Sequence, residues 1–205
     1  MRVAVFGGAG RVGRHVVAGA LARGYEVTAL VREPEPPMAG VRHVVGDVLD
    51  GPDVEGVLAG CEAVLSSLGT PSVEYPGTLL EDGMRTITAA MRRLGIRRVI
   101  AVAGSGILDH PEGGLIHDRP EFPAMYRAIS RAHAGTWSAL RDSRLDWTLV
   151  CTTTQVNGAE PGRVRALPDR LPDGGAEIGV GDVATFMLDQ IADTRHFARR
   201  VGLSW

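Results

Sequence analysis

The chain has 205 residues, of which 44% are hydrophobic, and its formal net charge is -2. A chain of this length and composition can form one domain with a proper core. The small net charge argues against a nucleic-acid-binding surface, which would carry a basic excess. No apolar run is long enough to span a bilayer, and the amino terminus resembles a strand rather than a signal peptide, so we expect a cytoplasmic protein that binds no membrane.

Two residue types limit the possible chemistry. All 22 Lys+Arg residues are arginine, so neither a lysine Schiff base nor a lysine-assisted proton relay is available. The two cysteines, Cys61 and Cys151, lie far apart without a metal-type spacing. We therefore expect two buried thiols and no metal site.

The first chemically informative stretch covers residues 3–13, an apolar run that leads into glycines. It predicts a buried strand, a phosphate-binding loop and the start of a helix whose N-H groups attract an anion. Gly7 would supply the tight turn, Gly10 would let the backbone approach a pyrophosphate, and Gly13 would let the helix pack closely. Such a glycine pattern alone also follows strands in many other proteins. Helical spacing after the loop supports the prediction, with Val12, Val16, Val17, Ala20 and Leu21 on one face and Gly24 as the stop.

A second buried strand is predicted at residues 26–31, and Arg32 follows it. The residue at this position faces the adenosine ribose, where an acid suits NAD and an arginine suits the 2′-phosphate of NADP. A guanidinium on a phosphate forms strong charge-assisted hydrogen bonds. We therefore expect NADP(H) as the cofactor. Arg11 and Arg14 either assist in phosphate binding or are solvated surface charges.

Residues 33–40 are predicted to form a loop, and residues 41–45 a third strand that is followed by Asp47 and Val48. Asp47 can accept a hydrogen bond from the adenine amino group while the Val48 side chain lies against the ring. It can equally cap the turn that follows. The sequence leaves both interpretations open.

The middle of the chain continues the alternation with a short helix at residues 53–59 and a strand at 63–67 that ends at Leu68, Gly69 and Thr70. The carboxyl end of that strand should lie where the strand order reverses, which is where ligands bind in such sheets. The next helix should bury Leu80, Met84, Ile87, Met91 and Leu94 and end at Gly95. Residues 98–102 then form the fifth strand, with a glycine-rich exit at 103–106.

Residues 107–123 show no periodicity and are expected to wall the substrate site. The next predicted element is a helix that buries Met125, Ile129, Ala132, Thr136 and Leu140, and a strand at 147–150 follows it. Short strands are then predicted at 164–167 and 176–180. The last elements are a helix that Asp182 caps, which buries Val183, Phe186, Met187 and Ile191, and a closing strand at 198–203. The alternation predicts an α/β fold of the Rossmann type, a doubly wound parallel sheet in a single domain 1–205. Residues 156–205 would form an irregular part that covers the substrate side.

The glycine loop, the 30–32 segment, the Gly-Asp-Val triplet at 46–48, the 140–148 segment and the late helix at 182–188 follow one another in a specific order. In this order the chain resembles the atypical short-chain dehydrogenases of the NAD(P)H-binding, NmrA-like group, and within it the flavin reductases of the biliverdin reductase B type. The resemblance implies hydride transfer to a planar acceptor such as a flavin, quinone or tetrapyrrole. It places the cofactor against Gly7, Gly10, Arg11, Val12, Gly13, Arg32, Asp47, Val48, Leu68, Gly69, Thr70, Gly104, Ser105, Cys151 and Thr152.

The resemblance also frames the catalytic candidates. Ser105 lies at, or one position from, the serine that follows the fifth strand in flavin reductases. Their histidine after the sixth strand falls in residues 152–155, where this chain has none. The tyrosine and lysine of ordinary short-chain dehydrogenases fall on Ile129 and His133. His133 could titrate near neutral pH and donate a proton, or it could only hydrogen-bond locally.

Other side chains are weaker candidates. Tyr126 is more typical of a packed aromatic residue, and His110 and His117 on the wall loop are expected to be exposed. The pair His117-Asp118 lacks the further ligands that a metal site needs.

Three functions are consistent with these residues. The first is an NADPH-dependent reductase, a monomer or homodimer acting on a small molecule, in which the proton comes from solvent. The second is an NADP sensor that changes its affinity for a partner, and the third is a redox-neutral isomerase, cyclase or epimerase that uses an inherited crevice. Only the unusual segment 151–155 and the long wall loop favour the third.

Overall fold

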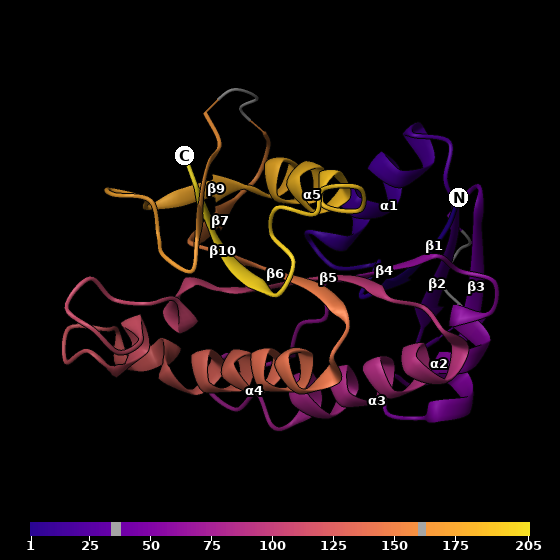
Figure 1. Ribbon diagram of the computed structural model, residues 1–205, viewed down its shortest axis with the longest axis horizontal. Helices are drawn as coiled ribbons and strands as arrows, with labels where there is room; N and C mark the ends of the chain where they lie inside the picture. The colour runs from indigo at the N-terminus through magenta and orange to yellow at the C-terminus, as the bar shows by residue number, and fades with distance from the viewer. Residues whose placement is uncertain (34–37, 160–162) are drawn as a thin grey trace.

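The computed structural model describes residues 1–33, 38–159 and 163–205. Its main body is an eight-stranded sheet in the order β3-β2-β1-β4-β5-β6-β10-β8 (Figure 1). All neighbouring strands are parallel except β8, which runs antiparallel to β10. The strands are β1 (Arg2–Phe6), β2 (Glu26–Val31), β3 (Val41–Val45), β4 (Ala63–Ser66), β5 (Arg98–Gly104), β6 (Asp146–Thr152), β8 (Arg165–Pro168) and β10 (Arg199–Ser204). The predicted doubly wound α/β fold is confirmed, with one antiparallel edge strand.

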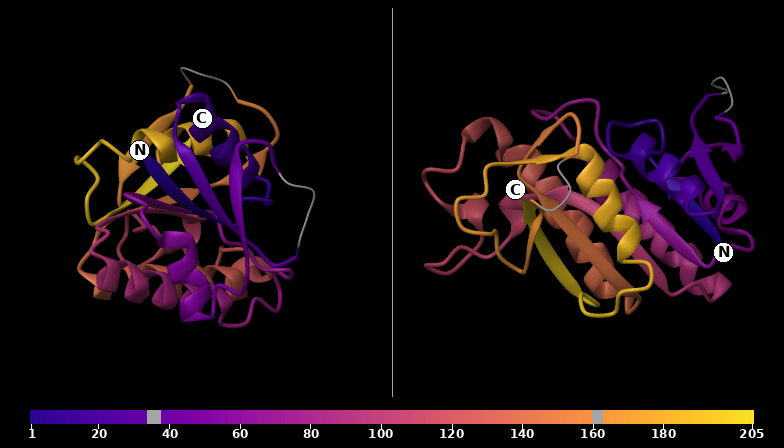
Figure 2. Two further views of the ribbon diagram at one scale, coloured as in Figure 1. Left: turned by 90° about the vertical axis from the view of Figure 1, so that its right-hand side faces the viewer. Right: turned by 90° about the horizontal axis from the view of Figure 1, so that it is seen from above.

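Helices cover both faces of the sheet, so the molecule has three layers (Figure 1, Figure 2). The first and last helices lie together on one face, and the other three pack side by side on the opposite face. The helices are α1 (Gly13–Ala22), α2 (Gly51–Leu58), α3 (Leu79–Leu94), α4 (Arg127–Ser143) and α5 (Val180–Asp189). Three short 3-10 turns between β5 and α4 are η1 (Ser105–Ile107), η2 (Ile116–Asp118) and η3 (Ala124–Tyr126).

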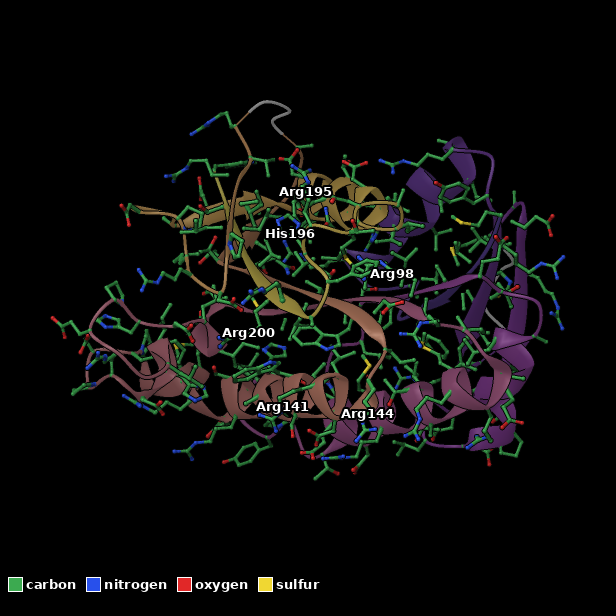
Figure 3. The ribbon with its side chains drawn as sticks, viewed as in Figure 1. Arg98, Arg141, Arg144, Arg195, His196 and Arg200 are labelled. Carbon is green, nitrogen blue, oxygen red and sulfur yellow. The ribbon has the colours of Figure 1, made fainter. Side chains whose placement is uncertain are left out.

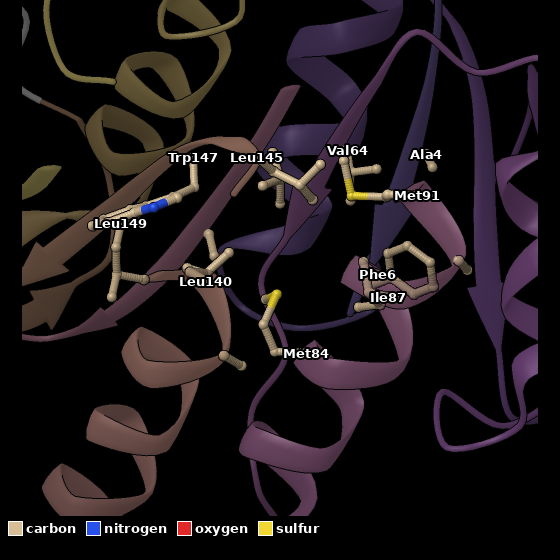
Figure 4. Packing of buried hydrophobic residues seen from close by; sticks show 14 of the residues in the cluster. Ala4, Phe6, Val64, Met84, Ile87, Met91, Leu140, Leu145, Trp147 and Leu149 are labelled. Carbon is tan, nitrogen blue, oxygen red and sulfur yellow. The ribbon is translucent and has the colours of Figure 1, made fainter. Parts of the chain in front are cut away.

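The core has two halves because successive side chains of a strand point to opposite faces of the sheet. In β1, Ala4 and Phe6 enter the layer under α2, α3 and α4, whereas Val3 and Val5 enter the layer under α1 and α5. Figure 4 shows Phe6 beside residues of α3 in the first layer. A fully buried side chain of this size contributes roughly 1.5–3 kcal/mol to folding.

The strand order reverses between β1 and β4. Phe6, the last residue of β1, is level with Leu30 of β2 on one side and with Ser66 of β4 on the other. The carboxyl ends of the central strands therefore lie at one edge of the sheet. The segments that follow these strands are the ones that the sequence indicates as a cofactor site.

The carboxyl-terminal part adds both strands and a second sheet. β10 lies beside β6, and β7 (Thr154–Val156) pairs with β9 (Glu177–Gly179) in a separate two-stranded sheet. The short strands predicted in this region are confirmed with shifted ends. β7 was not predicted as a separate strand.

Two buried arginines hold this part together (Figure 3). The Arg98 guanidinium donates to the Gln190 carbonyl at 2.9 and 2.6 Å and to the Asp146 carbonyl at 2.6 Å. Burial lowers the pKa of Arg98 to about 10. Arg200 donates to the Ile107 carbonyl and to Asp109 Oδ1, which lies 2.7 Å away. Arg200 thereby ties β10 to η1 and to the loop that follows.

Several predictions for the helices were wrong at their ends. Asp50 caps α2, and its Oδ1 accepts the Asp53 N-H at 3.0 Å, so the helix begins at Gly51 rather than Asp53. Gly179 precedes α5, while Asp182 lies in its first turn and accepts the Trp205 Nε1-H at 2.8 Å. Leu94 is 46% exposed at the end of α3, and Met125 is 65% exposed in η3, before α4 begins. Helical periodicity does not show where the last turn leaves the core.

Cys61 and Cys151 are buried free thiols, as predicted. Among the described residues, no helix combines the length and the apolar character that crossing a bilayer requires.

Candidate cofactor and active site

The glycine loop between β1 and α1 is built by close backbone approach. Gly7 has φ +77°, and a Cβ there would lie 2.5 Å from the Ser67 carbonyl oxygen. A Cβ at Gly13 would collide with the Gly7 carbonyl oxygen and would lie 2.7 Å from Ser67 Oγ. The expected turn at Gly7 and the close packing at Gly13 are both confirmed. Ser67, whose hydroxyl donates to the Gly7 carbonyl at 3.0 Å, fixes the loop to the end of β4.

The loop leaves backbone donors without acceptors. No hydrogen bond from the N-H of Arg11, Val12 or Gly13 reaches any acceptor in the described parts of the chain. The first turn of α1 has no acidic residue, and its N-cap residue, Val12, makes no capping hydrogen bond. These donors and the positive end of the helix dipole form an anion site of the kind that binds a pyrophosphate. The residues present therefore suit a dinucleotide.

The three arginines of this region differ in what they contact. Arg32 is exposed after β2, and no described residue forms a hydrogen bond or an ion pair with it. Arg11 donates to the Gln155 carbonyl at 3.0 Å and so joins the glycine loop to β7. Arg14 is exposed and lies 3.4 Å from the Gly10 carbonyl oxygen. One nitrogen of the Arg11 guanidinium therefore has a protein partner, and the contact of Arg11 with the cofactor stays a prediction.

After β3, Asp47 caps the turn that follows it, which is one of its two predicted roles. Asp47 Oδ1 accepts the Leu49 N-H at 2.9 Å, and the Asp47 N-H donates to Asp53 Oδ2 at 2.9 Å. Asp47 is exposed, and its Oδ2 has no partner among the residues that the structure describes. Val48 is only 6% exposed and packs in the core, and its contact with adenine stays a prediction. Part of the loop predicted before β3, residues 34–37, lies outside the described residues.

The exit of β4 offers backbone rather than side chains. Gly69 is exposed, and no atom lies within 4 Å of the position of a Cβ there. Leu68 is partly buried against the core, and the Thr70 hydroxyl donates to the Ser72 carbonyl at 2.7 Å. A ligand can therefore approach the main chain at Gly69 without meeting a side chain.

At the exit of β5, Ser105 begins η1 and is partly exposed. Its hydroxyl makes no hydrogen bond with a described residue. The Gly104 N-H donates to Nδ1 of His133 at 3.1 Å. Burial lowers the pKa of His133 to about 4, so the expectation that it titrates near neutral pH is not supported.

The exit of β6 contributes less than expected. Cys151 is fully buried, and burial raises the pKa of its thiol, so its side chain does not line an open site. The Thr152 hydroxyl is 3.4 Å from the Ala103 carbonyl and accepts a hydrogen bond from Gln155 Nε2 at 3.0 Å. Thr152 therefore holds β6, β5 and β7 together.

The predicted wall loop is attached to α4 at several points. His117 Nδ1 lies 2.8 Å from Ser130 Oγ, and the His117 side chain is only 11% exposed, so the expectation that it is exposed was wrong. The Arg127 guanidinium donates to the His117 and Arg119 carbonyls at 2.8 and 2.7 Å. His110 is also partly buried and accepts the Glu112 N-H at 3.2 Å. Tyr126, at 46% exposure, is not the packed aromatic that was expected.

Two contributors were missed from the sequence. Ser67 was assigned only to the end of a strand, and Ser130 was not noticed within its helix. Ser67 stands next to the predicted cofactor segment 68–70, which is a usable signal. Nothing in the sequence near Ser130 indicates its contact with His117, since that contact depends on the path of the wall loop.

This geometry agrees with the comparison to known families. The sequence profile of the NAD(P)H-binding family matches residues 7–194. The chain belongs to the NAD(P)H-binding family. Family membership accounts for the glycine loop, the parallel sheet and the convergence of strand ends at one edge.

Relatives show how far the similarity extends. The chain is 28% identical over 120 residues to a 3-beta-hydroxysteroid dehydrogenase of Mycolicibacterium neoaurum, and the match covers 52% of this chain and 33% of that protein. The chain thus aligns with about a third of the length of this curated relative. Among solved structures, a candidate exported protein of Burkholderia pseudomallei has a TM-score of 0.87 at 27% identity, with 100% of both chains covered.

Two further solved structures share the fold. A candidate NADH-flavin reductase of Streptococcus pneumoniae has a TM-score of 0.83 at 24% identity, with 100% of this chain and 99% of that chain covered. An anaerobillin reductase of Escherichia coli O157:H7 has a TM-score of 0.81 at 21% identity, with 100% of this chain and 97% of that chain covered. At these identities the likeness establishes the common architecture.

Proposed function

We propose that the protein is an NADPH-dependent oxidoreductase that transfers a hydride to a small planar acceptor such as a flavin, a quinone or a tetrapyrrole. The observation that carries the proposal is a set of hydrogen-bonding groups at the carboxyl ends of the strands that have no partner among the described residues. It comprises the N-H groups of residues 11–13, the Arg32 guanidinium and the Ser105 hydroxyl. Polar groups in folded proteins are normally paired, so such a set is suited to a polar ligand.

Each group has a role in binding. The N-H groups of residues 11–13 would hold the pyrophosphate, and Arg32 would pair with the ribose 2′-phosphate. Asp47 Oδ2 can accept from the adenine amino group while Oδ1 keeps its bond to the Leu49 N-H. Gly69 allows the ligand to approach the backbone closely. NADPH bound in this way supplies the hydride.

The acceptor class is supported by what the site lacks and by the structures that share its fold. His133 is neutral at physiological pH, so it does not act as a charged acid next to Ser105. A flavin, quinone or tetrapyrrole can take its proton from water after hydride transfer, and therefore does not require a dedicated acid. A candidate NADH-flavin reductase and an anaerobillin reductase both share the architecture.

The test is NADPH oxidation by the purified protein, followed at 340 nm with FMN, a soluble quinone and biliverdin as separate acceptors. We expect acceptor-dependent oxidation with at least one of them, and a kcat/KM for NADPH at least about tenfold above that for NADH, since a phosphate-guanidinium pair contributes more than about 1.4 kcal/mol. An absence of oxidation with the whole panel would contradict the proposal. Equal kcat/KM values for NADPH and NADH would contradict the role of Arg32.

A further inference from the structure

Helix α4 braces the turn that follows β5 at two points. Ser130 and His133 are three residues apart on α4 and so share a face of the helix. A Cβ at Gly104 would lie 3.2 Å from His133 Nδ1, and a Cβ at Gly106 would collide with Ser130 Oγ. The two glycines therefore allow α4 to contact the backbone on both sides of Ser105.

The contact with Gly104 determines which His133 nitrogen carries the proton. A backbone N-H is always a donor, and the Gly104 N-H points to Nδ1 at 3.1 Å. Nδ1 must then be the acceptor, so the neutral ring carries its proton on Nε2. A second proton on Nδ1 would face the Gly104 N-H and break this bond. Burial acts in the same direction, because it disfavours the charged imidazolium.

The other nitrogen is available to a ligand. Nε2 has no hydrogen-bond partner among the described residues, and the His133 side chain is largely but not fully buried. The last residue of β4, Ser66, is level with Ala101, whereas β5 continues to Gly104. The ring therefore contacts β5 at Gly104, beyond the residues that β4 flanks, and Ser105 is the next residue of the chain.

We propose that His133 is a catalytic residue that acts as a neutral hydrogen-bond donor through Nε2-H. This inference rests on the proposed function. The hydride adds to an electrophilic atom of the acceptor, and its two electrons move along the conjugated system to a carbonyl oxygen or ring nitrogen. Nε2-H binds that atom and stabilises the charge, and water then supplies the proton that completes the two-electron reduction. The imidazole keeps its own proton throughout.

A fixed donor and an acid differ in their dependence on pH. If His133 donated its proton, the rate would follow the ionisation of the imidazole and fall as the pH rises through its pKa. A fixed donor that is already neutral gives a rate that does not change between about pH 5 and pH 8. A donor aimed at a developing charge contributes about 10²–10³ in kcat, which sets the expected size of the effect.

The experiment compares three variants in the NADPH assay with a quinone. His133→Leu removes the donor, and His133→Gln keeps an oxygen for the Gly104 N-H and an NH₂ donor. His196→Leu is the matched control, because His196 is a partly buried histidine outside the proposed site, and its Nδ1 lies 2.8 Å from Gln190 Oε1. We expect kcat to fall about 100-fold in His133→Leu with little change in KM for NADPH. The Gln variant should recover at least about tenfold of this loss, and the control should match the wild type. Circular dichroism verifies folding.

Histidine ¹⁵N NMR gives a readout that does not depend on turnover. We expect His133 to show a protonated Nε2 and an unprotonated Nδ1 at pH 7, and no titration above pH 5. The opposite tautomer, or a rate profile with a midpoint between pH 5.5 and 7.5 that His133→Gln abolishes, would overturn the inference. If the wild type turns over and the turnover of His133→Leu is within about threefold of it, this inference alone is overturned. Absence of wild-type turnover with every acceptor would overturn the proposed function as well.

Discussion

The polar groups at the two ends of the parallel strands differ in their hydrogen-bond partners. At the amino edge, where the parallel strands begin, three arginines are paired: Arg2 with Glu26 at 2.6 Å, Arg97 with Asp146 at 2.9 Å, and Arg98 with backbone carbonyls. At the carboxyl edge, where these strands end, Arg32 and the N-H groups of residues 11–13 have no partner within the described parts of the chain.

Two surface hollows lie at the amino edge. One of about 390 Å³ is lined by Arg2, Glu26 and Arg42 among others, and one of about 250 Å³ by Arg92, Arg97 and Arg144 among others. The proposed dinucleotide site therefore rests on the N-H groups of residues 11–13 at the start of α1, and not on either hollow.

The largest expected effect comes from closing the glycine cradle with Gly13→Ala. The added Cβ would collide with the Gly7 carbonyl oxygen and crowd Ser67 Oγ, which moves the loop N-H groups out of place. We expect NADPH affinity to fall at least about 100-fold by isothermal titration calorimetry. The control is Gly56→Ala within α2, where the nearest atom to the new Cβ is 3.8 Å away and where alanine should stabilise the helix by about 0.5–1 kcal/mol. If Gly13→Ala binds NADPH as tightly as the wild type, the glycine loop does not hold the cofactor.

Arg98→Met tests the paired side of the comparison. The substitution keeps an apolar stem but leaves the Gln190 and Asp146 carbonyls without their donor inside the protein. We expect a loss of about 3 kcal/mol in the free energy of unfolding, measured by urea denaturation, with unchanged NADPH affinity. A loss of NADPH affinity in a folded Arg98→Met protein would show that the two edges are not independent.

The central strands and the glycine loop could be predicted because their signals are local. The apolar run of β1 and the glycines at positions 7 and 13 lie within one short stretch, and the backbone there has few alternatives. The contacts of each polar side chain could not be predicted, because they depend on segments far away. Arg11 and Arg32 are alike in the sequence, but only Arg11 finds a carbonyl, that of Gln155 on β7.

His117 and Asp182 illustrate the same limit. Their residue types and positions suggested an exposed loop histidine and a helix cap, whereas tertiary contacts with Ser130 and Trp205 decide their roles. The preference of a residue type for a local position predicts its role only until contacts with distant segments override that preference.

Acid should weaken the fold through His133. The pKa of this group in the folded state, about 4, is below the ordinary value of 6.5, so the unfolded chain binds the proton first as the pH falls. The stability is complete above about pH 6.5 and is lost between pH 6.5 and 4, by roughly 2–3 kcal/mol. Urea unfolding at pH 7, 5 and 4 should show a clearly smaller loss in His133→Gln than in the wild type. Equal losses in the two proteins would contradict the lowered pKa of His133 in the folded state.

The smallest effect is expected for Arg2→Ala at the amino edge. Both side chains of the Arg2–Glu26 pair are exposed, at 41% and 69%, and such pairs contribute little because water screens them. We expect the thermal midpoint to stay within about 2 °C of the wild type and the affinity for NADPH to be unchanged. A larger change in either quantity would show that the hollow beside Arg2 contributes to stability or to NADPH binding.

The most direct test of the unpaired edge is calorimetric titration of NADPH and NADH into the wild type, Arg32→Glu and Arg131→Glu. Arg131 is an exposed arginine on α4 and matches the change in charge. We expect the wild type and Arg131→Glu to bind NADPH at least about tenfold more tightly than NADH, and Arg32→Glu to lose this preference. If Arg32→Glu leaves the ratio of the two dissociation constants unchanged, the role of Arg32 in selecting NADPH is contradicted.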